Sequence, residues 1–312
     1  MRKITYLLPV CLMCNFADAD VLDLTTALQA TYRTCVGIDD DLYDMKKLAG
    51  INTAVTGVGT GLGVGAVATG LSKAKTDRQV ADLERLLDKL KEMTTDPDGG
   101  NTTVTKEAKD AFYTQFEQSY DIALQNKPKT QNQLDELNKK SKKLGNWRTG
   151  LLAANTATNI AGVLIANKNK VSDDLQSKID RCVTNVKGLK NSISAAKAAG
   201  EDTAEAEQIY DACRDYEFVD LSPINKRAKG AMISSAVGIV TGGAGTATSA
   251  MANSDKVRQG DEQKEKNLNT AANALAVGST VASASATVFN AAQIAAIKKV
   301  ANVSVKCSEV LK

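Results

Sequence analysis

The chain has 312 residues, with 39 Lys and Arg against 36 Asp and Glu, and no histidine. A net charge of +3 with no long block of one sign gives no electrostatic case for nucleic-acid binding. Because histidine is the commonest general base and a common metal ligand, its absence counts against an ordinary hydrolase. We therefore expect no enzyme, and no cofactor, metal site or small-molecule substrate is evident from the sequence.

The N-terminus has the three parts of a signal peptide. A basic pair begins at Arg2, residues 4–16 are apolar, and an A-x-A cleavage site ends at Ala19. The pattern predicts removal of residues 1–19, whereas the alternative is a buried N-terminal helix. An exported chain of this kind is expected in the bacterial periplasm or outer membrane.

Apolar residues at spacings of three and four then predict a series of helices, separated by short breaks. Such patterns cover residues 20–35, 80–90, 108–120, 175–196 and 206–216. Breaks are expected at Gly37, at the polar run 94–103, at Pro128 and at Gly200. Ser222 followed by Pro223 is a strong signal for a new helix start.

Four uncharged stretches rich in small residues interrupt this series. They cover residues 51–71, 149–166, 230–254 and 267–297. Glycines recur in rows with four-residue spacing, which puts them on one face of a helix. The row glycines expected to mediate helix packing are Gly57, Gly61, Gly65, Gly150, Gly162, Gly238, Gly242 and Gly278.

Missing side chains on such rows let two helix backbones approach closely. Three interpretations stay open: a soluble bundle with a small-residue core, membrane-spanning helices, and self-association into a ring, tube or fibre. If the rows pack, Gly61→Leu and Gly238→Leu should disrupt helix contact more than Gly70→Leu, which lies off the main row. The rows resemble the glycine-zipper segments of bacterial outer-membrane proteins, and this resemblance is compositional.

Four cysteines remain after the signal peptide, and an even count in an exported chain predicts disulfides. Gly260 is the expected turn between the last two small-residue helices, and Cys213 and Cys307 each lie 47 residues from it. Two antiparallel helices rise equally per residue, so these cysteines return to one level. The predicted pairs are Cys213–Cys307 and, by analogy, Cys35–Cys182. The competing pairing joins Cys182 to Cys213 across the intervening turn.

The two halves of the chain share an order of features that suggests duplication. Each half has a Y-x-x-C motif, a small-residue stretch, a connector, a second such stretch and a second cysteine. The predicted units are residues 20–200, with a polar helical connector at 72–148, and residues 201–312. Chance similarity between helical segments of biased composition is the alternative.

Together these patterns predict an all-α fold of long antiparallel helical hairpins. The expected function is that of an exported cell-envelope structural or assembly protein that packs or self-associates through its small-residue helices. Its expected partners are further copies, envelope proteins or a membrane. The alternative is a pore-forming or transport-type membrane protein with four weakly apolar spanning helices.

Overall fold

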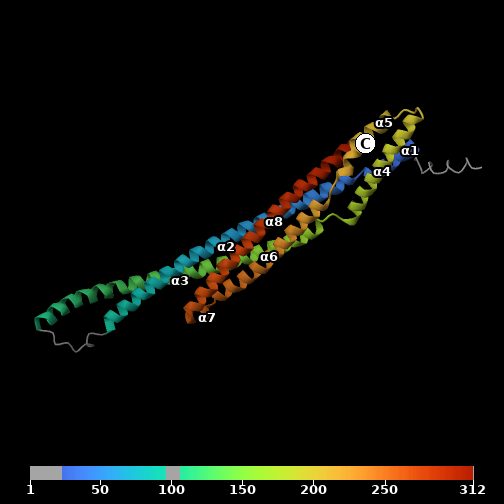
Figure 1. Cartoon of the computed structure of the whole chain (residues 1–312). Coiled ribbons are helices and arrows are strands. Elements are labelled where there is room, and N and C mark those ends of the chain that lie inside the picture. The colour runs from blue at the N-terminus through green and yellow to red at the C-terminus, as the bar shows by residue number, and fades with distance from the viewer. Residues whose placement is uncertain (1–22, 96–105, 312) are drawn as a thin grey trace, which may run out of the picture. The chain divides into compact units, whose positions relative to one another are not determined.

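A computed structural model describes residues 23–95 and 106–311 of the chain, without the side chains of residues 89–128 and 259. This part of the chain is helical and contains no strand, so the predicted all-α class and the long helical hairpins are confirmed (Figure 1). The predicted signal peptide and most of the predicted loop at 94–103 lie outside the described residues. The elements are α1 (Leu24–Cys35), α2 (Ile38–Thr95), α3 (Lys106–Lys168), α4 (Asp173–Ala198), α5 (Ala204–Cys213), the 3₁₀ helix η1 (Arg214–Phe218), α6 (Ser222–Ala252), α7 (Asp255–Gly260) and α8 (Glu262–Leu311).

The described residues divide into two compact units, each built from segments far apart in the sequence. The first unit contains residues 23–53, 165–231 and 288–311, and the second contains the described residues of 54–164 together with 232–287. The sequence places its unit boundary elsewhere, at residue 200, so each compact unit draws on both halves of the chain. The internal duplication therefore stays a prediction.

The first unit has an apolar core. Tyr216 of η1 is buried in one core with aliphatic side chains of α2, α4, α6 and α8, and its hydroxyl donates to Ser304 Oγ at 2.7 Å. Burial raises the pKa of Tyr216 to about 12, because the charged phenolate is poorly solvated there. In α4 the buried residues are those that the spacing predicts, with Ser192 added: Leu175, Ile179, Cys182, Val186, Leu189, Ser192, Ile193 and Ala196.

Two glycines end helices of the first unit where the backbone needs a positive φ. Gly37 has φ +87° between α1 and α2, and Gly200 has φ +79° after α4. At the end of α4, the amide of Glu201 donates to Ala196 O at 3.0 Å, which satisfies a carbonyl that the helix leaves open. Both breaks lie where the sequence predicts them.

Two disulfides lie in the first unit. Cys35 at the end of α1 is bonded to Cys182 of α4, and Cys213 at the end of α5 is bonded to Cys307 of α8. The Cα–Cα separations are 4.9 and 4.5 Å. These are the two pairs that the sequence analysis predicts, and α7 occupies the turn from which the equal offsets were counted.

We expect non-reducing peptide mapping of the protein to recover Cys35 joined to Cys182 and Cys213 joined to Cys307. Loss of both bonds to a reductant should destabilise the first unit, because each bond closes a loop of 94 or 147 residues and such bonds typically contribute about 2–5 kcal/mol. Thermal melting followed by circular dichroism, with and without reductant, measures this effect. A mapped fragment that joins Cys182 to Cys213 would contradict the pairing.

The second unit is a bundle in which α2, α3, α6 and α8 run side by side (Figure 1). On each of these helices the buried positions alternate steps of three and four residues, which is the spacing of a left-handed coiled coil. The buried positions that make up this series are 56, 59, 63, 66, 70 and 73 in α2; 141, 145, 148, 152, 155, 159 and 162 in α3; 235, 238, 242, 245, 249 and 252 in α6; and 269, 272, 276, 279, 283 and 286 in α8.

One predicted break is wrong. Pro128 lies inside α3, which is continuous from Lys106 to Lys168. A long helix can accommodate a proline by giving up one backbone hydrogen bond and bending locally, so the residue alone does not end it. The predicted start at Ser222 is confirmed, since α6 begins there.

Candidate functional site

The interior of the second unit is polar, unlike that of the first. Among the described residues of the uncharged stretches, its only large buried apolar side chain is Leu152, and the other buried apolar side chains are alanines. Within the uncharged stretches, the buried polar residues of the bundle are Thr56, Asn155, Asn159, Ser235, Ser249, Asn253, Asn269, Ser279 and Ser283. We call this set, together with the buried bases Lys73 and Arg148, the polar seam.

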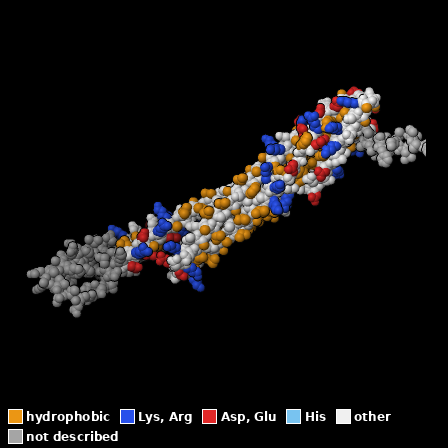
Figure 2. Space-filling view, viewed as in Figure 1, with side chains coloured by type: hydrophobic (Ala, Val, Ile, Leu, Met, Phe, Trp, Pro, Cys, Tyr) orange, Lys and Arg blue, Asp and Glu red, His pale blue; other side chains and the backbone are white. Residues whose placement is uncertain are grey.

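The outer face of the same unit is apolar. On the face that Figure 2 shows, orange and white side chains cover the uncharged stretches. Large exposed side chains include Val240 at 71%, Leu71 at 63% and Val281 at 60% exposure. The others on these stretches are Val58, Val64, Trp147, Ile160, Leu164, Ile233, Val237, Met251 and Val277. Polar side chains inside and aliphatic ones outside are the reverse of a water-soluble bundle.

In the middle of the seam, asparagines of α3 are paired with serines of α8. Asn155 Nδ2 donates to Ser279 Oγ at 2.9 Å, and Asn159 Nδ2 donates to Ser283 Oγ at 3.0 Å. Ser283 Oγ donates to Asn155 Oδ1 at 3.0 Å. Ser279 Oγ also lies 3.1 Å from Gly238 O, which brings α6 into the same network. Buried polar groups are costly without partners, and these side chains satisfy one another.

At one end of the seam, Arg148 of α3 binds two other helices. Its exposure is 0%, and its Nε donates to Ser249 Oγ of α6 at 2.8 Å. Its two terminal nitrogens donate to α8, to Asn273 Oδ1 at 3.1 Å and to Asn269 Oδ1 at 2.7 Å. A guanidinium has several donors in a fixed fork, so one side chain ties three helices together.

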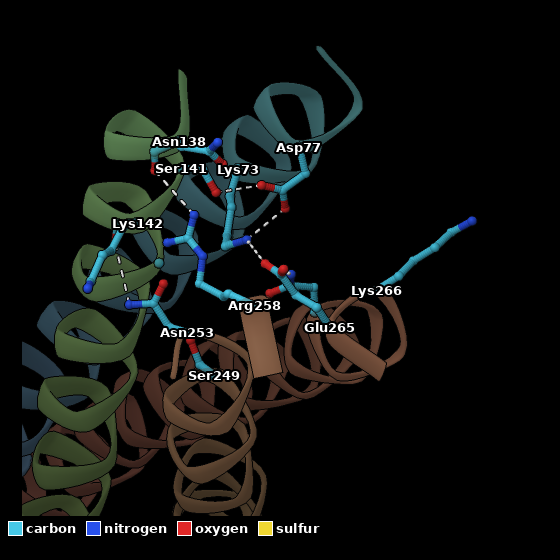
Figure 3. Close-up of polar contacts among 12 residues, drawn as sticks. Lys73, Asp77, Asn138, Ser141, Lys142, Ser249, Asn253, Arg258, Glu265 and Lys266 are labelled. Atoms are coloured by element: carbon cyan, nitrogen blue, oxygen red, sulfur yellow. Dashed lines mark hydrogen bonds and ion pairs between the residues drawn. The ribbon is translucent and has the colours of Figure 1, made fainter. Parts of the chain in front are cut away.

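Lys73 provides the second buried charge at this end. Figure 3 shows it between Asp77 and Glu265, with its Nζ 2.7 Å from Asp77 Oδ2 and 2.9 Å from Glu265 Oε1. Ser141 Oγ of α3 donates to Asp77 Oδ1 at 2.5 Å. The two carboxylates remain partly exposed, so this ion pair joins α2 to α8 at the edge of the seam.

A cavity of about 470 Å³ opens beside this ion pair, lined mainly by α2 and α8. Its lining mixes bases and carboxylates, including Arg78, Arg258 and Glu84. Burial, with nearby Glu262, Asp88 and Glu265, raises the pKa of Glu84. The described residues contain no group of three or more Cys, Asp or Glu side chains suited to a metal ion, and this balanced lining defines no single ligand class.

The structure corrects part of the predicted glycine packing. A Cβ added to Gly57, Gly61 or Gly150 would have no non-local atom within 4 Å, so these three glycines do not pack against another helix. Gly65 and Gly278 make only ordinary contacts, near Leu151 and Thr241. The physical reason is the helical repeat. Residues four apart are rotated by about 40° around the helix axis at each step, so a strict four-residue row turns away from the neighbouring helices, whereas positions that alternate steps of three and four stay at the interface.

Gly162, Gly238 and Gly242 do lie close to neighbouring helices. A Cβ at Gly238 would lie 2.6 Å from the amide of Asn159, and one at Gly242 would lie 2.6 Å from Thr156 Oγ1. One at Gly162 would lie 2.9 Å from the hydroxyl oxygen of Ser235. In each case the nearest atom belongs to a polar side chain and not to a helix backbone.

Further glycines of the bundle lie at close approaches, although the four-residue rows did not identify them as packing residues. They face Asn, Ser or Thr side chains of neighbouring helices, and they are Gly59, Gly63, Gly70 and Gly145. Gly70 faces the amide of Asn273, and Gly145 faces the amide of Asn253. The glycines at these close approaches therefore make room for polar side chains of the neighbouring helices.

These contacts reverse one prediction from the sequence. Gly70→Leu and Gly238→Leu are now expected to lower the melting temperature, because a side chain there would overlap an asparagine and overpacking costs about 1–3 kcal/mol. Gly61→Leu is the matched control, since Gly61 is exposed with open space beside it. Thermal melts of the three variants measure the difference. A larger fall in melting temperature for Gly61→Leu than for the other two variants would show that helices pack through the four-residue row after all.

Comparison with known proteins adds no family or function: no protein-family model, curated protein or solved structure matches this chain. By length and composition, three helical stretches within the described part of the chain are able to cross a membrane. These are Leu24–Asp88, Lys129–Ala198 and Glu262–Leu311, and each contains an 18-residue window with a mean hydropathy of 1.4, 1.3 and 1.3, respectively. The fourth helix of the bundle, α6, is not among them.

Proposed function

We propose that this chain is an exported cell-envelope protein of structural or assembly type, whose second unit crosses a membrane as a four-helix bundle. The observation that carries the proposal is the inverted polarity of that unit. Its interior holds asparagine, serine and buried bases, while valine, leucine and isoleucine cover its surface. Water disfavours such a surface, whereas a lipid hydrocarbon layer matches it.

The lengths of the charge-free segments support the same proposal. Residues 48–72 of α2, 149–167 of α3, 230–254 of α6 and 267–297 of α8 carry no charged side chain. At 1.5 Å per residue the shortest spans about 28 Å and the longest about 46 Å. A hydrocarbon layer of about 30 Å needs about 20 residues. Trp147, which is 60% exposed, lies at one end of the α3 segment, where interfacial tryptophans are common.

Hydrogen bonding within the seam favours a structural role over transport. Interhelical hydrogen bonds and small residues are the means by which helices associate in lipid, where the hydrophobic effect between them is lost. The polar side chains at the centre of the seam form hydrogen bonds with one another, namely those of Asn155, Asn159, Ser279 and Ser283. The polar seam is nevertheless the feature that supports the alternative, a pore-forming or transport-type protein. Ion leakage from proteoliposomes that contain the mature chain would favour that alternative.

Self-association is a second part of the proposal. Gly57 and Gly61, which do not pack within the chain, lie on the outer side of α2 with open space beside them. In lipid such a G-x-x-x-G pair allows close contact with a helix of another copy. Crosslinking of the reconstituted protein tests this idea, with Gly57→Leu and Gly61→Leu expected to reduce the crosslinked dimer. Unchanged crosslinking of both variants would remove this surface from the proposal.

Membrane fractionation with a carbonate wash is the experiment that tests the main proposal. Carbonate opens vesicles and releases peripheral proteins, so a spanning bundle is expected to stay in the pellet. Recovery of the mature chain in the carbonate supernatant would contradict the proposal and favour the interpretation of the second unit as a soluble bundle.

A further inference from the structure

Basic side chains gather in the first unit just beyond the charge-free segments. On each of the four long helices, the first charges past the segment on this side are lysines or arginines. We call this set the basic collar: Lys46 and Lys47 of α2, Lys168 at the end of α3 with Lys170 just after it, Lys226, Arg227 and Lys229 of α6, and Lys298 and Lys299 of α8.

Hydrogen bonds between the helices place the collar at one level of the first unit. Gln293 Nε2 of α8 donates to Asn169 O at 2.7 Å, beside the collar lysines at the end of α3. Arg227 of α6 donates to Ala292 O of α8 at 2.7 Å. Asn52 Nδ2 of α2 donates to Asn290 Oδ1 of α8 at 2.9 Å. Counted from these contacts at 1.5 Å per residue, all nine bases lie within about 14 Å along the bundle axis.

No collar base forms an ion pair with a carboxylate of the described residues, and the electrostatic effect of Lys226 on Asp220 is the smallest of the causes that lower the pKa of Asp220. Most of its side chains are exposed, and the ion pairs of the first unit use other bases, namely Lys178, Lys197, Arg214 and Lys306. The nearest acids along the chain are Asp44, Asp173 and Asp220, and each lies beyond the collar on the side away from the charge-free segment. Along the chain, each charge-free segment is therefore followed on this side first by bases and then by acids.

The opposite ends of the charge-free segments lack this order. Lys73 and Arg148 are buried and bonded within the bundle. Acids and bases are mixed between residues 261 and 266 at the start of α8, and exposed Lys142 is paired with Asp255 at 2.8 Å. Among the described residues, only the end that lies in the first unit therefore presents bases before any acid at all four segments, because at the opposite end α6 is followed first by Asp255 and α8 has Glu265 next to its first lysine.

We propose that the basic collar binds the phosphate head groups of anionic phospholipids in the leaflet next to the first unit. This inference rests on the membrane-spanning function proposed above. An anionic lipid surface attracts each nearby Lys or Arg by about 1 kcal/mol, which is about a fivefold change in affinity. The attraction fades within a Debye length, so only bases adjacent to the hydrocarbon layer contribute.

Lipid retention by the purified chain tests the collar. The mature protein is incubated in detergent with an equimolar mixture of phosphatidylglycerol and phosphatidylcholine, repurified, and its bound lipid is quantified by mass spectrometry. We expect phosphatidylglycerol to be enriched at least about fivefold, with the enrichment falling in 0.5 M salt. The collar variant is Lys46→Gln, Lys47→Gln and Lys229→Gln, and it should lose most of this enrichment.

The matched control removes the same charge from α4 of the same unit, by Arg181→Gln, Lys187→Gln and Lys190→Gln. These three side chains are exposed and lie away from the collar in sequence. Enrichment that persists in the control and is lost in the collar variant supports the proposal. Equal loss in both variants, absence of enrichment in the wild type, or full displacement of the lipid by inorganic phosphate overturns it.

A carbonate wash of the same variants separates this inference from the proposed function. If the wild type and the collar variant both stay in the pellet without phosphatidylglycerol enrichment, the collar proposal fails and the spanning bundle stands. If the wild type is released by carbonate, the spanning bundle fails. Flotation of the released protein with phosphatidylglycerol vesicles then tests the collar alone, and lack of binding there overturns it.

Discussion

Replacement of Arg148 by methionine is expected to destabilise the second unit by about 3 kcal/mol or more. Methionine keeps much of the length of the side chain but donates no hydrogen bond. Asn269 and Asn273 each lose a donor to a side-chain oxygen, and Ser249 loses its contact with Nε. Each buried polar group left without a partner costs about 1–3 kcal/mol. Asn269 is buried and Ser249 is fully so, which places this substitution among the most damaging single changes in the bundle.

Thermal melting by circular dichroism measures this loss, with Lys143→Met as the control. Lys143 lies on the same helix and is exposed, so its replacement should change stability by no more than about 0.5 kcal/mol. Arg148→Lys should fall between the two, because an ammonium group cannot reach the three acceptors in the geometry of the guanidinium fork. Equal melting temperatures for Arg148→Met and Lys143→Met would show that the network contributes nothing to stability.

The helices and the disulfide pairing could be predicted because each depends on local spacing. In α4 the apolar residues spaced three and four apart from Leu175 to Ile193 are buried as predicted, because they form the helix's one apolar face and its other faces are polar. Cys213 and Cys307 lie opposite each other because two antiparallel helices rise equally from the turn at α7. Neither inference requires knowledge of what surrounds the bundle.

The interior of the second unit could not be predicted, because its sequence has two faces of similar size and no charge. On α2, Gly57 and Gly61 form one row, and Gly59 and Gly63 form another nearly opposite. Spacing alone does not tell which row packs, and the buried one is Gly59 with Gly63. The signal that distinguishes them lies on other helices, where Asn155 and Thr280 need the space that these glycines leave.

Sequence patterns are usually interpreted on the assumption that apolar residues such as valine are buried and polar residues such as asparagine are exposed, as in a water-soluble protein. Here Asn155 and Asn159 are buried, whereas Val240 and Val281 are exposed. The burial of these asparagines depends on hydrogen bonds to serines that lie 124 residues further along the sequence, and no local pattern reveals such partners. The asparagines that interrupt the uncharged stretches are thus the residues that hold the bundle together.

Val281→Lys is expected to remove most of the chain from the carbonate-resistant membrane fraction. Val281 lies near the middle of the charge-free segment of α8, at residues 267–297, and is 60% exposed. A lysine at the centre of a spanning helix costs about 2.5–3.5 kcal/mol on insertion scales, while an exposed substitution in water changes stability by about 0.5 kcal/mol or less. Val305→Lys is the control, since Val305 is 42% exposed on the same helix but lies outside that segment. If both variants fractionate and melt as the wild type does, the apolar surface of the second unit faces water and the membrane proposal is wrong.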